Sequence, residues 1–205
     1  MSETLRDFIG YDFDGTLVGK PKSWDILRRA TKFFLPIRDG AIEGINFISS
    51  QGNLETLGIF TVRPEWLRKR QTKKQIKRKN IPNLEVTHTA NSYKGKIEAL
   101  FNSALGWNPK TPITAIEGRI ERQIELKKIG RILLVDDSAD KVIKAAEELY
   151  EEKPNIQPLL ERFILITFDP SQQEAVKEEK YDKFRSIIYI RGWSDIQSLI
   201  SVIRT

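Results

Sequence analysis

The sequence predicts an α/β fold, a doubly wound and mainly parallel sheet flanked by helices. Short, continuously apolar runs alternate with segments of helical spacing, which is the pattern of buried parallel strands and their crossover helices. Several of the apolar runs end in acidic or turn-forming residues, as buried strands do at the edge of a sheet. We expect one domain over residues 1–205, because no repeat, low-complexity tract or linker interrupts the pattern.

The first half of the chain predicts three strands, at residues 8–11, 56–62 and 84–87. A segment at 24–34 has the spacing of a helix or an irregular turn. A helix at 41–50 is stopped by residues 51–53, and Pro64 begins another helix that runs to residue 80.

The second half predicts helices and strands in regular alternation. An amphipathic helix at 94–105 is closed by Gly106, and a helix at 113–129 is closed by Gly130. The clearest strand lies at 131–135 and is followed by a helix that ends near residue 152. Two further strands at 163–168 and 187–190 precede a last helix at 194–203, with Ser194 as its N-cap.

The composition limits the catalytic groups and metal sites that the chain can form. The chain has no cysteine and a single histidine, His88, which excludes disulfides, zinc–thiolate sites and thiol nucleophiles. Catalysis would have to use carboxylates, lysines, hydroxyls and a hard cation with oxygen ligands. No apolar run reaches the ~18 residues of a membrane span, and the N-terminus has no signal-peptide pattern. We therefore expect a cytoplasmic protein with no membrane partner.

The positive charge is concentrated in one segment. The chain carries a net charge of +6, while residues 63–80 hold nine basic side chains and one acidic one, a charge of +8 that leaves −2 on the rest. This basic segment is either a solvated helix face or a surface for a polyanion such as nucleic acid.

Side chains suited to catalysis follow the predicted strands where each strand ends. Asp12 and Asp14 follow the first strand, and Gly15 lets the chain bend so that both can face one pocket. Because parallel strands have their carboxyl ends at one edge of the sheet, we expect these groups to meet groups from the later strands. The later groups are Thr61, Lys94, Lys96, Asp136 and Asp137.

This set of groups suits phosphoryl transfer. One carboxylate can attack phosphorus to form an acyl-phosphate, while another protonates the leaving oxygen and later deprotonates a water. A carboxylate repels a phosphate dianion, so the site needs Mg²⁺, held by Asp12 with Asp136 and Asp137. A lysine and the Thr61 hydroxyl would bind the phosphoryl oxygens. This hypothesis requires Asp12 to lie within about 8 Å of the later aspartates.

The ordered motifs resemble the haloacid dehalogenase-like (HAD) superfamily of phosphatases and phosphotransferases. Residues 12–17, with the sequence DFDGTL, match its first motif without a departure, Thr61 matches the second, and residues 135–138 look like the fourth. The resemblance implies a Rossmann-like HAD core with Asp12 as nucleophile and Asp14 as general acid/base. It also implies Mg²⁺ bound by the Asp12 side chain, the Asp14 backbone carbonyl and Asp137, with Asp136 in support.

The assignments of the third-motif lysine and of Arg63 each leave an alternative open. The lysine of the third motif is Lys94 or Lys96, with a slight preference for Lys94. Gly15, Thr16 and Arg63 are assigned to substrate binding, although Arg63 fits the basic helix equally well. About twenty residues separate the first motif from the helix at 41–50, too few for a large helical cap, so we expect a capless or minimally capped enzyme.

The resulting hypothesis is a magnesium-dependent phosphomonoester hydrolase that acts through an aspartyl-phosphate on Asp12. Its substrate would be a phosphorylated small molecule or macromolecule. One alternative is a nucleic-acid end-processing phosphatase that uses residues 63–80, and another is a non-catalytic phosphate- or polyanion-binding protein on the same fold. A receiver domain is disfavoured because its acidic pair would precede the phosphoacceptor, and no nucleotide-hydrolase phosphate loop occurs.

Overall fold

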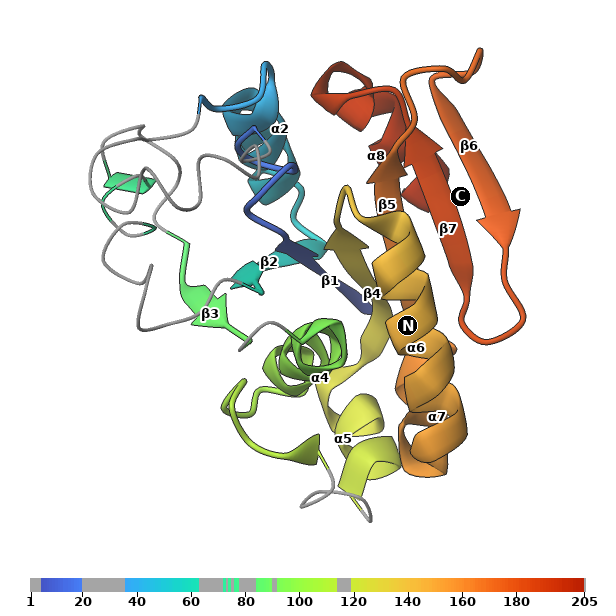
Figure 1. The fold of residues 1–205 in the computed structure, drawn as a ribbon. Helices are drawn as coiled ribbons and strands as arrows, with labels where there is room; N and C mark the ends of the chain where they lie inside the picture. Colours follow the sequence, from blue (N-terminus) through green and yellow to red (C-terminus); the bar gives the residue numbers. More distant parts are fainter. Residues whose placement is uncertain are drawn as a thin grey trace.

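The protein is built on a seven-stranded sheet in the order β3-β2-β1-β4-β5-β7-β6 (Figure 1). The computed structural model describes residues 5–19, 36–62, 72, 74, 76–77, 84–89, 92–113 and 119–204, except for the side chains of residues 202 and 204. All neighbouring strands are parallel except β6 and β7. The strands are β1 (Arg6–Tyr11), β2 (Leu54–Thr61), β3 (Val86–His88), β4 (Ile129–Val135), β5 (Phe163–Phe168), β6 (Val176–Lys180) and β7 (Ser186–Ile190).

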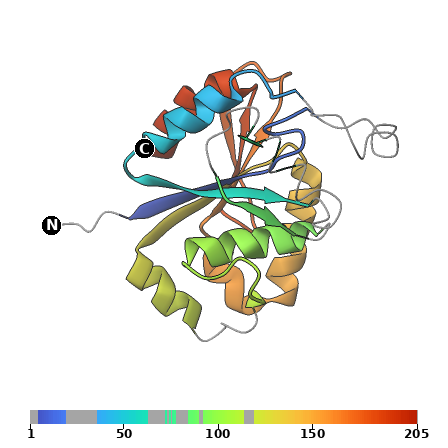
Figure 2. The same ribbon diagram turned by 90° about the vertical axis from the view of Figure 1, so that its left-hand side faces the viewer.

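Helices cover both faces of the sheet (Figure 2). One face packs against α2 (Ala41–Ser49) and α8 (Ile196–Arg204). The other packs against α4 (Tyr93–Ala104), α5 (Ile120–Lys127), α6 (Ala139–Glu152) and α7 (Gln157–Leu160). Strand β1 contributes to both cores, since Ile9 and Tyr11 belong to the first and Phe8 to the second. Burial on both faces explains why the strands are continuous apolar runs.

The connections place a topological switch point at the centre of the sheet. From β1 the chain adds β2 and β3 on one side, then returns to β1 and adds β4 and β5 on the other. The arrangement is consistent with a Rossmann-like fold, in which ligands bind beyond the carboxyl ends of the two strands at the switch point. Here those strands are β1 and β4, so the fold predicts a ligand site at the residues that follow Tyr11 and Val135.

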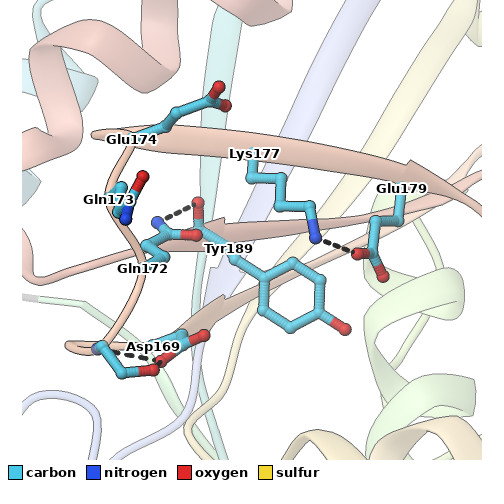
Figure 3. Close-up of a pocket in the computed structure, with 8 residues that line it drawn as sticks. Asp169, Gln172, Gln173, Glu174, Lys177, Glu179 and Tyr189 are labelled. Atoms are coloured by element: carbon cyan, nitrogen blue, oxygen red, sulfur yellow. Dashed lines mark hydrogen bonds and ion pairs between the residues drawn. The ribbon is translucent and has the colours of Figure 1, made fainter.

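The β6–β7 hairpin extends the sheet at the end away from β3. Figure 1 shows α8 behind this hairpin and none of the described helices in front of it. Side chains of β6, β7 and the β5–β6 connection instead line an open, polar surface there (Figure 3). Strand β6 is an exposed edge strand, and its sequence VKEEK carries the charges that discourage edge-to-edge pairing.

Most of the predicted elements are confirmed to within a few residues, and two predictions need correction. The helix expected at 113–129 is described only as α5, Ile120–Lys127; Lys128 ends it with a φ of +53°, and Gly130 lies inside β4. The last helix begins at Ile196, because Ser194 lies in the short 3-10 helix Trp193–Asp195 and caps nothing. Strand β6 was not expected.

Two expected segments, a helix or irregular turn at 24–34 and a helix at 64–80, fall largely outside the described residues. The structure describes no residue of the segment at 24–34. Of the segment at 64–80 it describes only residues 72, 74, 76 and 77, and all four are helical. Ile76 of that segment is buried in the core on the α2 side, whereas Lys74 and Lys77 are exposed. Among the helices of the described ranges, none has the length and apolarity to cross a bilayer.

Candidate functional site

Strands β1 and β4 each place an aspartate at the switch point, because the backbone hydrogen bonds of the sheet continue one residue beyond each strand. The Asp12 N–H donates to the Val135 carbonyl at 2.8 Å, one residue beyond β1. The Asp136 N–H donates to the Ile166 carbonyl at 2.9 Å, one residue beyond β4. Both carboxylates are therefore attached to backbone that is hydrogen-bonded into the sheet, which fixes their position as a loop alone would not.

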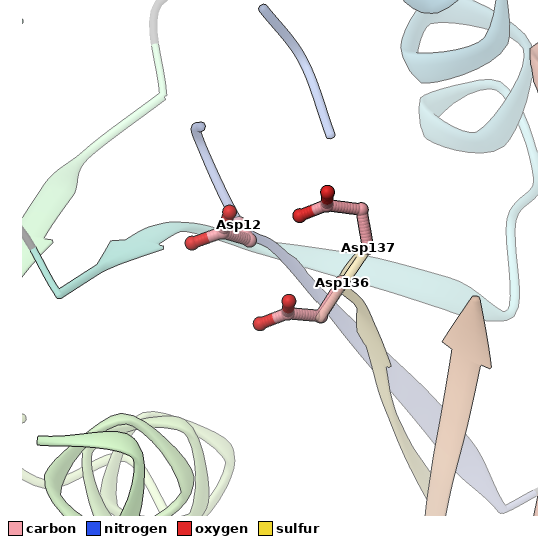
Figure 4. A group of neighbouring side chains, drawn as sticks. All are labelled: Asp12, Asp136 and Asp137. Carbon is pink, nitrogen blue, oxygen red and sulfur yellow. The ribbon is translucent and has the colours of Figure 1, made fainter. Parts of the chain in front are cut away.

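Three carboxylates meet at this edge of the sheet. Asp12, Asp136 and Asp137 each offer one oxygen within 4.8 Å of the others (Figure 4). Asp12 is only 4% exposed and Asp136 fully buried, whereas Asp137 is partly exposed. The predicted convergence of an early carboxylate with the later pair is confirmed.

Lys96 binds two of these carboxylates. Its Nζ lies 2.6 Å from Asp12 Oδ1 and 2.6 Å from Asp136 Oδ2, and its side chain is completely buried. The same ammonium lies 4.7 Å from the centroid of the Tyr93 ring. Lys96 is thus held between two charges and an aromatic face, inside the protein.

Lys94 lies elsewhere. Its Nζ pairs with Glu148 at 2.9 Å and with Glu152 at 2.7 Å on α6, at the protein surface. The slight preference for Lys94 in the sequence interpretation is therefore not supported by its position. Of the two lysines, the structure brings Lys96 to the carboxylates.

The start of α4 explains the difference between the two lysines. Ser92 caps the helix, its Oγ accepting from the Gly95 N–H at 3.0 Å, so the helix begins at Tyr93. Residues two positions apart on an α-helix point about 200° away from each other. Lys96 shares a stripe with the buried residues Leu100 and Ala104, at i+4 and i+8, and this stripe faces the sheet.

The site holds more negative charge than its own residues neutralise. Burial raises the pKa of Asp12 to about 8; Asp136 adds to the increase and Lys96 opposes it. Burial alone would lower the pKa of Lys96, but Asp136 and Asp12 outweigh it and hold that pKa above its ordinary value. Three carboxylates share one ammonium group here, so a divalent cation bound among them would favour the ionised form of Asp12.

The donor set also fits such a cation. Every candidate ligand in the cluster is a carboxylate oxygen, the ligand type that Mg²⁺ and Ca²⁺ prefer, and the described residues offer no sulfur or histidine nitrogen there. These three aspartates could therefore hold a hard divalent ion.

The loop after β1 packs against Asp137. Gly15 has a φ of +82°, and a Cβ built on it would overlap the Asp137 carboxylate. The Thr16 Oγ1 accepts from the Asp137 N–H at 3.0 Å, while the Thr16 carbonyl accepts from Trp193 Nε1 at 2.9 Å. Gly15 and Thr16 thus fix the position of Asp137, and the expectation that they bind substrate stays a prediction.

The other expected site residues are placed as follows. Asp14 is partly exposed and forms an isolated bridge with Val18 in the loop after β1. Thr61 is the last residue of β2 and is fully buried, and its carbonyl accepts from the Thr89 N–H at 3.0 Å and the Thr89 hydroxyl at 3.3 Å. Arg63 and most of the basic segment 63–80 lie outside the described residues.

Two residues at the site were not anticipated. Arg38 donates from Nη1 to the Gly15 carbonyl, and its guanidinium lies 4.7 Å from the centroid of the Phe168 ring. Tyr93 covers Lys96, as described above. Arg38 could not have been found from the sequence, since it belongs to no motif. Tyr93 could have been found, because it lies one turn before the buried Ile97 on the same helix.

Comparison with known proteins does not add to this description. The chain matches no protein-family model, and neither the curated proteins nor the solved structures give a significant match.

Proposed function

We propose that the protein is a magnesium-dependent phosphomonoester hydrolase that forms an aspartyl-phosphate on Asp12. One observation carries the proposal: oxygens of Asp12, Asp136 and Asp137 lie within 4.8 Å of one another, with the Lys96 ammonium 2.6 Å from two of the carboxylates. A nucleophilic carboxylate, a cation site and a fixed ammonium group at one sheet edge are the parts that phosphoryl transfer needs.

The reaction would proceed in two steps. In the first, an Asp12 oxygen attacks phosphorus, the bond to the leaving oxygen breaks, and Asp14 donates a proton to that oxygen. In the second, Asp14 takes a proton from a water, which attacks the phosphorus of the acyl-phosphate. Inorganic phosphate leaves, and Asp12 is regenerated.

The remaining residues would support these steps. Lys96 holds Asp12 in place and supplies a fixed positive charge beside the phosphoryl oxygens, at no cost in reorganisation because it is already paired. Asp136 keeps Lys96 charged and buried, and Gly15 and Thr16 fix Asp137. A bound Mg²⁺ would supply charge neutralisation at the phosphoryl group, with Asp12, Asp137 and the Asp14 carbonyl as its proposed ligands and Asp136 in support.

Membership of the HAD superfamily is part of this proposal. It is supported by the order of the motifs, which runs from Asp12 and Asp14 through Thr61 and Lys96 to the aspartate pair. The proposed absence of a large cap depends on the segment between Gly19 and Pro36, which lies outside the described residues. The nucleic-acid alternative depends likewise on residues 63–80, of which only four are described.

A phosphate-release assay tests the proposal. We expect the purified chain to hydrolyse p-nitrophenyl phosphate with Mg²⁺ and to stop when the metal is chelated. Asp12→Asn should lower kcat by at least about a thousandfold, as loss of a nucleophile does, whereas Asp182→Asn, at an exposed acid in the β6–β7 turn, should match the wild type. Equal activity of the two variants would refute the mechanism, and a binding-only protein would release no phosphate from a panel of phosphomonoesters.

A further inference from the structure

A polar groove leads away from the carboxylate site. It consists of two adjoining pockets of about 450 and 600 Å³, which share Asp169 and Tyr189 in their walls. The inner pocket begins at Asp137 and Ser138, beside the candidate cation site. The outer pocket lies over β6, β7 and the β5–β6 connection (Figure 3). Each is within the size range of pockets that hold small ligands.

The outer part of this groove is acidic. Lys177 and Glu179 form an ion pair at 2.6 Å and so neutralise each other. Beyond Asp137, the carboxylates of Asp169 and Glu174 remain in the outer walls, and Asp140 adds a third at the inner end. Among the described residues of the walls, Lys141 supplies the one further ammonium group, at the inner end, where its Nζ lies 5.7 Å from the centroid of the Tyr93 ring.

Aromatic rings form part of the same walls. Tyr189 lines both pockets and is partly exposed, and Phe168 lines the inner one. Phe168 already has a cation near its ring, the guanidinium of Arg38 at 4.7 Å. A ring face beside carboxylates is the combination that binds ammonium and guanidinium groups, and it repels a polyanion.

We propose that this groove receives the leaving group of the phosphorylated substrate and selects leaving groups that carry an ammonium or guanidinium group. The phosphoryl group would lie at the three aspartates, and the cationic part would lie against Tyr189 near Asp169. The inference rests on the proposed function for the phosphoryl end of the substrate, but the preference for a cation belongs to the groove. Two sources share this chemistry, a small phosphorylated amino alcohol and a phosphoserine segment with basic neighbours.

Calorimetric binding to the whole chain with Mg²⁺ tests the proposal without any need for turnover. One arm compares the non-hydrolysable phosphonate analogue of choline phosphate with that of 3,3-dimethylbutyl phosphate, which has the same shape without the positive charge. The other compares two peptides with a non-hydrolysable phosphonate in place of phosphoserine, one flanked by lysines and one by acetyl-lysines. We expect the charged member to bind about fivefold more tightly or better in at least one arm, and the arm that shows the preference identifies the source.

Variants of the groove residues test which side chains cause the preference for a charged ligand. Asp169→Asn and Tyr189→Leu should each reduce the ratio of the two affinities toward one, whereas Asp182→Asn removes an exposed acid outside the groove walls and should leave the ratio unchanged. Equal affinities of the charged and uncharged ligands in both arms would overturn the inference.

The outcomes separate the two proposals. If the wild type hydrolyses p-nitrophenyl phosphate but shows no charge preference in either arm, the groove inference fails and the proposed function stands. If the charged ligands bind preferentially but no phosphomonoester is hydrolysed, the groove binds cations as inferred and the proposed function fails.

Discussion

The backbone of Gly15 packs directly against the carboxylate of Asp137, and no space is left between them for a side chain. The contact joins the loop after β1 to the loop after β4, the two strands at the switch point. Gly15 also has a φ of +82°, a conformation that costs an L-residue about 1–2 kcal/mol. Both facts require glycine at this position.

Gly15→Ala should therefore destabilise the fold and displace Asp137. We expect the free energy of unfolding in urea to fall by about 2 kcal/mol, from backbone strain together with the overlap. The affinity for Mg²⁺, measured by titration calorimetry, should fall as well. Gly52→Ala is the control, because a Cβ at Gly52 meets nothing within 4 Å. Equal stability of the two variants would contradict the described contact.

Lys96→Met should be far more damaging than Lys94→Met. Removing the buried ammonium leaves the Asp12 and Asp136 carboxylates facing each other without a partner, and breaking a buried ion pair in this way costs about 3–5 kcal/mol. Lys94→Met removes only surface ion pairs, so its unfolding curve should remain close to the wild type. Added Mg²⁺ should restore part of the stability lost in Lys96→Met. The account fails on this point if both variants unfold at the same urea concentration.

Divalent cations should stabilise the folded chain. The excess negative charge at the three aspartates predicts that Mg²⁺ raises the melting temperature and that a chelator reverses the increase. At a hundredfold excess over Kd, the stabilisation would be about 2.7 kcal/mol. Asp137→Asn should reduce this shift, and Asp182→Asn should not. An identical Mg²⁺ shift in these two proteins would mean that the cation binds elsewhere.

The convergence of the site could be predicted from the sequence because it depends only on parallel strands ending at one edge. Asp12 and Asp136 each follow a continuous apolar run, and such runs are distinctive. The lysine could not be chosen with the same ease, because Lys94 and Lys96 both stand in the first turn of one helix. The stripe of Lys96 with Leu100 and Ala104 was the signal that distinguishes them, and it requires the helix start at Ser92 to be placed first.

Elements missed by the sequence interpretation lack a hydrophobic pattern. Strand β6 has four exposed residues out of five and, among the described strands, pairs only with β7 through its backbone, so nothing in VKEEK marks it as a strand. The end of helix α5 was placed too late because the buried Ile129 continues its apolar spacing while belonging to β4. Tertiary packing, which the local pattern does not contain, decided these boundaries.

The ion pair of Arg191 and Asp195, which follows β7, should make the stability of the fold depend on pH in the acid range. The guanidinium of Arg191 holds the pKa of Asp195 below its usual range through hydrogen bonds of 2.9 and 3.0 Å. The pKa is lower in the folded state than in the unfolded state, so the pair stabilises the fold above pH ~4, and this stabilisation is lost as the pH falls through the lower folded-state value.

Asp195→Asn should therefore lower the melting temperature at pH 7 by a few degrees. The difference from the wild type should begin to shrink below pH ~4 and should vanish once the pH is below the lower folded-state pKa, where the wild-type carboxyl is protonated too. Thermal melts from pH 2.5 to pH 7, with Asp182→Asn as a control, would measure it. A difference that grows toward acid pH would reverse the expected sign.

Chemical trapping of the acyl-phosphate tests the central claim most directly. The protein would be mixed with a phosphomonoester and Mg²⁺, quenched during turnover and treated with borohydride, which reduces an aspartyl-phosphate to homoserine; peptide mass spectrometry then locates the change. We predict homoserine at position 12, and none in Asp12→Asn or without Mg²⁺. Phosphate release with Asp12 unmodified, or homoserine at another aspartate, would contradict the account.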